Sequence, residues 1–128
     1  ATAADRIKVV ALIVIAGTMG PQSATLTLDM DGTQQTVQSS GNGPVDATFN
    51  AIQKLVPHTA ILELYQVHAV TEGTDAQAEV SVRLAAEGRS VTGKSSDPDT
   101  LVASAKAYLS ALNKLTARGA RLHSTAVG

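Results

Sequence analysis

The chain of 128 residues is long enough for one domain around a single core, and its formal net charge is −1. It contains one Phe, two Tyr, no Trp and no Cys, so Ala, Val, Leu and Ile must fill the interior. The lack of a basic block and of aromatic stacking surface argues against nucleic acid or an anionic membrane as partner. The lack of cysteine excludes a disulfide framework, a thiolate metal site and a cysteine nucleophile, and is compatible with a reducing cytosol.

The first half of the chain predicts three strands and a helix. Residues 6–16 are almost continuously apolar, which predicts a strand buried on both faces, in a central or interface position, rather than a signal peptide or a membrane span. Alternating residues 25–30, the turn Asp31-Gly32 and residues 33–39 predict a hairpin. Gly41-Asn42-Gly43 ends the last strand, and Pro44 occupies the first helical position ahead of apolar residues at helical spacing, namely Val45, Phe49, Ile52 and Val56.

The second half follows the same plan. Strands are expected over residues 59–70, 75–86 and 89–94, with a Glu87-Gly88 turn between the last two. Asp97 is the expected N-cap of a second helix and Pro98 follows it. One face of that helix is apolar and comprises Leu101, Ala105, Tyr108, Leu112 and Leu115. The chain after Arg118 lacks periodicity and is expected to fray.

The two halves are related by a shift of 54 positions (98 − 44), which places Pro44 on Pro98. The shift also aligns the hairpin residues Leu26, Leu28, Met30 and Val37 with Val80, Val82, Leu84 and Val91. We therefore predict an α+β fold of βββα-βββα order, with two three-stranded antiparallel sheets and one helix for each. The first unit is residues 6–56 and the second unit is residues 59–116, within a domain of residues 1–118 followed by a tail of residues 119–128.

This duplication bears on function in two ways. Pseudo-symmetry favours a binding or assembly module over a catalytic one, because it provides a good interface and a poor asymmetric active site. With only two helices, one sheet face in each unit must find its cover from the other unit or from another chain, so we expect a dimer.

Catalytic motifs are absent from the sequence: there is no HExxH, no GxSxG, no phosphate-binding Gly-Lys-Ser/Thr motif and no clustered set of metal ligands. Two alternatives nevertheless stay open. The chain could be a dimerisation module without a ligand, or a small enzyme that uses Tyr65 and His68 with Glu72 or Asp75.

Three blocks of the sequence carry a resemblance to a known family: residues 40–47 (SGNGPVDA), residues 64–80 (LYQVHAVTEGTDAQAEV), and residues 99–109 with 111–115 (DTLVASAKAYL and ALNKL). In this order they resemble the C-terminal regulatory domain of 2-isopropylmalate synthase over roughly residues 6 to 116. Citramalate and homocitrate synthases share the module, so isoleucine in place of leucine is the alternative effector.

The resemblance implies a cytoplasmic homodimeric enzyme whose barrel condenses acetyl-CoA with a 2-oxo acid on a divalent metal. Its last domain binds the end product, leucine, at a dimer interface and mediates feedback inhibition. The barrel is not part of this sequence, so the chain is expected to bind leucine and dimerise without turnover and without a cofactor of its own. It is read as an excised or separately expressed regulatory fragment.

The physics of Gly41-Asn42-Gly43-Pro44 agrees with such a site. Without Cβ atoms a ligand can approach the main chain, and the helix start offers unpaired N–H groups and partial positive charge to a carboxylate. Asp46 either meets the ligand ammonium or merely complements the helix dipole. By similarity to the family pocket, Val45, Leu62, Tyr65 and Ala69 surround the aliphatic side chain, with Ala76 nearby and Pro98 and Thr100 closing the pocket; for Leu62, ordinary core packing is the equal alternative.

Overall fold

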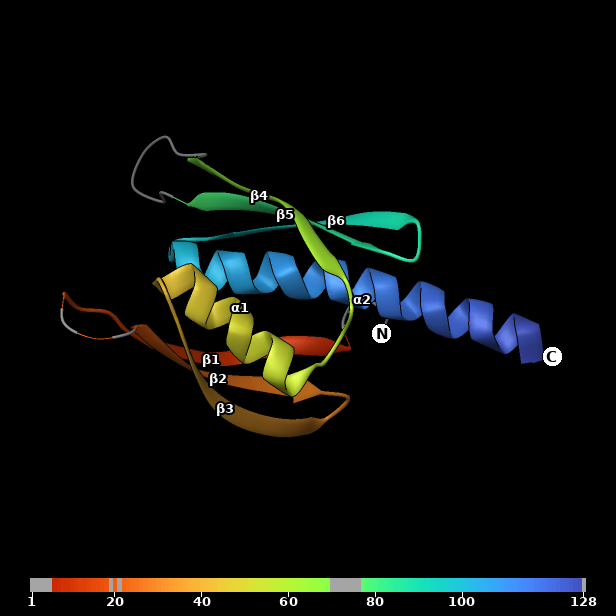
Figure 1. Cartoon of the computed structure of the whole chain (residues 1–128), viewed down its shortest axis with the longest axis horizontal. Coiled ribbons are helices and arrows are strands. Elements are labelled where there is room, and N and C mark those ends of the chain that lie inside the picture. Colours follow the sequence, from red (N-terminus) through yellow and green to blue (C-terminus); the bar gives the residue numbers. More distant parts are fainter. Residues whose placement is uncertain (1–5, 19, 21, 70–76, 128) are drawn as a thin grey trace.

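The computed structural model of the chain describes residues 6–18, 20, 22–69 and 77–127. It contains six strands and two helices in the order βββα-βββα (Figure 1). The elements are β1 (Ile7–Ile15), β2 (Gln22–Met30), β3 (Thr33–Gly41), α1 (Pro44–Leu55), β4 (Ile61–Ala69), β5 (Ala78–Ala86), β6 (Arg89–Asp97) and α2 (Thr100–Val127).

The strands form two separate antiparallel sheets, of order β1-β2-β3 and β4-β5-β6. Figure 1 shows both helices lying between the sheets. Helix α1 packs on β2 and β3, whereas α2 packs on β5 and β6 and also contacts β1 of the other sheet. The predicted fold class is therefore confirmed, and each unit supplies one sheet and one helix to a shared core.

The correspondence between the two units differs from the predicted shift of 54. The hairpin turn Asp31-Gly32 has positive φ values of 55° and 91°, and the turn Glu87-Gly88 has 53° and 78°. These turns are 56 residues apart (87 − 31), and the start of α1 is 56 residues from the start of α2 (100 − 44). The structural counterpart of Pro44 is thus Thr100 and not Pro98, so the shift of 54 was wrong for the hairpins and helices.

The first strands of the two units are related by a smaller shift. Ile15 lies opposite Ser23 and His68 lies opposite Glu79, so β1 and β4 are 53 residues apart (68 − 15) while β2 and β5 are 56 apart (79 − 23). The connection from the first to the second strand is therefore three residues longer in the second unit (56 − 53). The shift of 54 lies between these two values. It aligns Pro44 with Pro98, although Pro44 begins α1 and Pro98 precedes α2.

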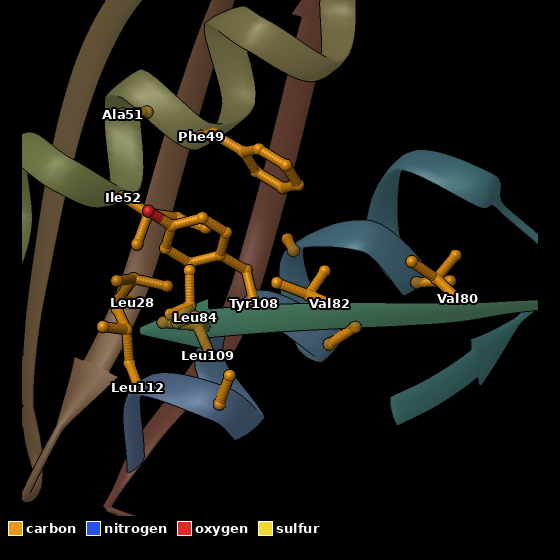
Figure 2. Close-up of a cluster of buried hydrophobic side chains, with 14 of the residues drawn as sticks. Leu28, Phe49, Ala51, Ile52, Val80, Val82, Leu84, Tyr108, Leu109 and Leu112 are labelled. Carbon is orange, nitrogen blue, oxygen red and sulfur yellow. The ribbon is translucent and has the colours of Figure 1, made fainter. Parts of the chain in front are cut away.

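The core is aliphatic, as the composition predicted. Leu26, Leu28, Val82, Leu84 and Ile52 are fully buried. Figure 2 shows the side chains of Phe49 and Ile52 from α1 and of Tyr108, Leu109 and Leu112 from α2 gathered over the sheets. Helix α2 contributes four alanines without exposed surface, which allow it to pack closely: Ala103, Ala105, Ala107 and Ala111.

Strand β1 is an edge strand, so its predicted central position is wrong. Its residues alternate between half-buried and exposed, and Val10, Ile13 and Ile15 are 47%, 60% and 64% exposed. The continuous apolar run misled because strands buried on both faces and edge strands with an uncovered apolar face share one sequence pattern. Whether that face lies in an interface stays a prediction.

The start of α2 also differs from the prediction. The N-cap is Asp99, whose Oδ1 accepts hydrogen bonds from the N–H groups of Leu101 at 2.8 Å and Val102 at 3.3 Å. Asp97 instead ends β6; its carboxylate accepts from the N–H of Asp99 at 2.9 Å and from Lys106 Nζ at 3.0 Å. The bond from the Asp99 N–H is the main cause that lowers the pKa of Asp97.

The C-terminal part of α2 runs past the boundary placed at residue 118 and ends at Val127. The residues expected to fray are helical, since Ala117, Arg118, Ala120 and Arg121 are good helix formers that extend an already nucleated helix. No helix in the described part of the chain is long and apolar enough to cross a membrane.

Gly93 of β6 permits the close approach of α2, because a Cβ at this position would overlap the backbone of Ala107 and Ala111. We predict that Gly93→Ala destabilises the chain by roughly 1–3 kcal/mol, the usual cost of overpacking. Gly17→Ala serves as the control, since a Cβ there meets nothing within 4 Å. Chemical denaturation should show a lower midpoint for Gly93→Ala alone; equal midpoints would contradict the tight packing of α2 on β6.

Candidate functional site

The start of α1 has no side-chain cap. Its N-cap residue is Gly43, with φ −159° and ψ 172°, and Pro44 follows. The first backbone hydrogen bond of the helix runs from the N–H of Ala47 to the carbonyl oxygen of Gly43, at 2.9 Å. By helix geometry, the N–H groups of Val45 and Asp46 have no intrahelical partner. The α1 start therefore presents backbone donors and the positive end of the helix dipole.

The equivalent start of α2 is closed by its own side chain. The carboxylate of Asp99 occupies the N–H groups of Leu101 and Val102, as described above. Of the two related helix starts, both within the described residues, α1 has no side-chain cap and α2 has one.

The two glycines beside α1 have different roles. A Cβ on Gly41 would lie 2.5 Å from the nitrogen of Ala47 and 2.7 Å from the Oδ2 atom of Asp46, so Gly41 lets the end of β3 pack against the first turn. A Cβ on Gly43 would meet nothing within 4 Å. Its extended φ suits any residue, so the space beside Gly43 is open and the backbone there does not need glycine.

Asp46 makes a local contact. Its Oδ2 atom accepts a hydrogen bond from the N–H of Asn42 at 3.0 Å, which fixes the loop before the helix. This position in the first turn also complements the helix dipole. Contact with a ligand ammonium stays a prediction for Asp46.

Tyr65 of β4 connects the two helices. Its ring packs edge-on against Phe49 of α1, with centroids 5.6 Å apart and an interplanar angle of 86°. Its hydroxyl lies 2.7 Å from the hydroxyl of Ser104 in α2. Neither Phe49 nor Ser104 was predicted to have a role in the site, since both read from the sequence as ordinary helix positions.

A β-bulge at Glu63 places Leu62 and Tyr65 on the same face of β4. Leu62 lies opposite Leu84, Tyr65 opposite Val82 and Val67 opposite Val80, and cross-strand partners share a face. Leu62 and Val67 are 42% and 45% exposed although they share that face with Tyr65. Leu62 is thus not ordinary core, and Val67 is a lining candidate that strand periodicity would have found.

The remaining residues that are predicted to bind leucine lie near one end of the molecule or outside the residues that the structure describes. Pro98 lies between β6 and α2, and Thr100 begins α2; both are exposed. Figure 1 shows α1 and α2 beginning at the same end of the molecule. Ala69 is the last residue of β4, and Ala76 lies outside the described residues.

The structure does not bring together the residues of the enzyme alternative, Tyr65 and His68. Tyr65 lies opposite Val82 on the core face of β4, whereas His68 lies opposite Glu79 on the other face. The two side chains therefore cannot converge on one substrate, and Glu72 and Asp75 lie outside the described residues. In the part of the chain that the structure describes, no three His, Cys, Asp or Glu side chains come together as a metal site requires.

Two cavities lie away from the residues that are predicted to bind leucine. One of about 420 Å³ lies between β1, β6 and α2 and is lined by Ile7, Lys106 and Asn113 among others. One of about 410 Å³ lies over the outer face of the second sheet and includes His68 and Arg83. Neither cavity is lined by a residue that is predicted to bind leucine, so neither cavity coincides with the candidate leucine site.

His58 joins the connection between the units to α2. The N–H of Ala60 donates to His58 Nδ1 at 3.1 Å, so Nδ1 is an acceptor and the proton of the neutral ring lies on Nε2. Nε2 then donates to the hydroxyl of Tyr108 at 2.9 Å. Burial lowers the pKa of His58 and raises the pKa of Tyr108 to about 12.

Together, the six strands and two helices define a duplicated α+β domain of βββα-βββα order. Residues 1–116 match the family model described as the LeuA allosteric (dimerisation) domain, and the chain belongs to this family. The resemblance found in the sequence is confirmed.

The chain is similar to several proteins named 2-isopropylmalate synthase. It is 72% identical over 123 residues to the one from Methylorubrum populi, covering 96% of this chain and 24% of the relative. The identity is 71% over 123 residues for Methylobacterium nodulans (96% and 24%) and 68% over 120 residues for a Bradyrhizobium species (94% and 23%). The chain therefore spans about a quarter of the length of the curated relatives that it matches.

The lowered pKa of His58 gives a prediction about pH. The unfolded chain, with an ordinary pKa of 6.5, binds the His58 proton more readily than the folded chain, so the free energy of unfolding falls as pH drops below 6.5. We expect the thermal midpoint to be lower at about pH 5.5 than at about pH 7.5, and this difference to shrink in His58→Gln. The exposed His68→Gln is the control and should keep the wild-type difference. A full pH dependence in His58→Gln would contradict the assignment.

Proposed function

We propose that this chain is the regulatory domain of a 2-isopropylmalate synthase and that it binds L-leucine as a feedback inhibitor. The family match supports a regulatory and dimerisation role, and the relatives' name supports the parent enzyme. The single observation that carries an amino-acid site is the uncapped start of α1 beside the capped start of α2.

In this proposal the ligand carboxylate takes the place of the missing cap. Its oxygens accept hydrogen bonds from the N–H groups of Val45 and Asp46 in the open space beside Gly43. The aliphatic side chain then lies toward the apolar face of β4, which carries Leu62, Tyr65 and Val67. The ligand ammonium pairs with the carboxylate of Asp46, which lies in the same first turn of α1.

We further propose that the site lies in a homodimer interface. Leu62 and Val67 remain nearly half exposed in the single chain, on the face of β4 that carries Tyr65. A second chain laid over this face would bury apolar area and enclose the ligand.

The catalytic activity belongs, in this proposal, to the three quarters of the relatives' length that the chain does not span. The parent would be a cytoplasmic acyltransferase that joins acetyl-CoA to a 2-oxo acid on a divalent metal in its barrel. In this proposal the domain acts on the reaction only by binding its effector.

L-leucine should stabilise the chain more than isoleucine, valine or any other amino acid in a thermal-shift panel. At about a hundredfold over its dissociation constant the ligand adds roughly 2.7 kcal/mol, which moves the midpoint by on the order of 5 to 10 °C. A response to isoleucine alone would assign the parent to citramalate synthesis. No response to any amino acid would leave a dimerisation module without a ligand.

Gly43→Asp should abolish leucine binding without harming the fold. The new carboxylate caps the first-turn N–H groups itself and repels the ligand carboxylate, while the extended φ of −159° and the open space accept the side chain. As a cap it should stabilise α1 by a few tenths of a kcal/mol. Calorimetric titration should show no leucine binding in a folded dimer, and the parent enzyme carrying the substitution should resist inhibition.

The control for this variant is Gly17→Asp. It adds the same charge at another open glycine, away from α1, and should keep the wild-type affinity for leucine. Unchanged affinity in a folded Gly43→Asp dimer would remove the α1 start from the site.

A further inference from the structure

Each helix carries a buried hydroxyl group one turn after its start. Thr48 Oγ1 donates to the carbonyl oxygen of Pro44, and Ser104 Oγ donates to that of Thr100, both at 2.8 Å. The residues are structural counterparts, because they are 56 positions apart (104 − 48), as the helix starts are. Both are fully buried.

Only Ser104 has a second partner, the hydroxyl of Tyr65 at 2.7 Å. The proton of Ser104 is already committed to Thr100, so Tyr65 donates and Ser104 Oγ accepts. In the first unit the counterpart of Tyr65 is Leu12 (65 − 53), since Leu12 lies opposite Leu26 and Tyr65 opposite Val82. A leucine has no hydroxyl to donate, so this bond breaks the pseudo-symmetry of the fold.

The bond attaches a strand that the helices otherwise hardly hold. Helix α2 packs on β5, β6 and β1, and α1 packs on β1, β2 and β3, but neither packs broadly on β4. The exposure of Leu62 and Val67 agrees with this. Pairing with β5 holds the backbone of β4 in its sheet. The Tyr65 hydroxyl bond to Ser104 links β4 to α2 and accompanies the edge-on contact of the Tyr65 ring with Phe49 of α1.

We propose that Ser104 is a positioning residue for the effector site: it holds the side chain of Tyr65 in place against Phe49 of α1 without touching the ligand. The inference rests on the proposed function. Without the bond the Tyr65 ring spends part of its time in other orientations, and the apparent dissociation constant rises by the inverse of the competent fraction.

The experiment is a calorimetric leucine titration of the full 128-residue chain. We expect Ser104→Ala and Tyr65→Phe to weaken leucine binding by about two- to tenfold each, the range that corresponds to one net hydrogen bond. The double variant should lose no more than either single variant, because both substitutions remove one bond. Ser104→Thr restores the hydroxyl and should recover the affinity.

Thr48→Val is the matched control, since it removes the counterpart hydroxyl that no tyrosine contacts, and it should stay within about twofold of wild type. Equal weakening in Thr48→Val and Ser104→Ala would indicate general loosening of the helices and overturn the inference. So would wild-type affinity in a folded Ser104→Ala dimer. Failure of the wild-type chain to bind leucine would instead overturn the proposed function, and this inference with it.

Discussion

The structure depends on one aromatic cluster, which is centred on Phe49. The chain has one Phe and two Tyr, and the Phe49 ring contacts both tyrosines: its centroid lies 4.5 Å from that of Tyr108 and 5.6 Å from that of Tyr65. Figure 2 shows the side chains of Phe49 and Tyr108 next to each other. The three aromatic residues come from α1, α2 and β4, so the cluster joins the two units. Small aliphatic side chains fill the rest, and the alanines of α2 let helix and sheet approach closely enough to bury them.

Duplication allowed the two helix starts to diverge. In the second unit Asp99 caps α2, and that helix carries the Ser104 contact to β4. In the first unit Gly43 leaves α1 uncapped, at a cost of a few tenths of a kcal/mol relative to a capping side chain. The second unit therefore has a capped helix tied to β4, and the first has an uncapped helix start, a difference that a strictly symmetric pair would not show.

Periodicity predicted the elements most clearly where one face is buried, as in β2, β5 and both helices, and the positive-φ turns at Gly32 and Gly88 were marked by their residues. The sequence could not show the bulge at Glu63, which puts Leu62 and Tyr65 on one face despite their odd spacing. Nor could it separate Asp97 from Asp99 as the cap, because both stand beside Pro98 and only the course of β6 decides. Tyr65 was found through the family resemblance, whereas Ser104 required the contact itself.

The exposed apolar side chains connect assembly with sensing. They belong to the edge strands: Val10, Ile13 and Ile15 on β1, and Ile61, Leu62 and Val67 on β4. Edge strands with an uncovered apolar face associate unless they are protected, and β1 contains a single charged residue, Lys8. Because Tyr65 shares its face of β4 with Leu62 and Val67, a chain that covers this face in the proposed dimer also walls in the space beside α1. Assembly and effector binding would then bury the same apolar surface, so each should strengthen the other through linkage.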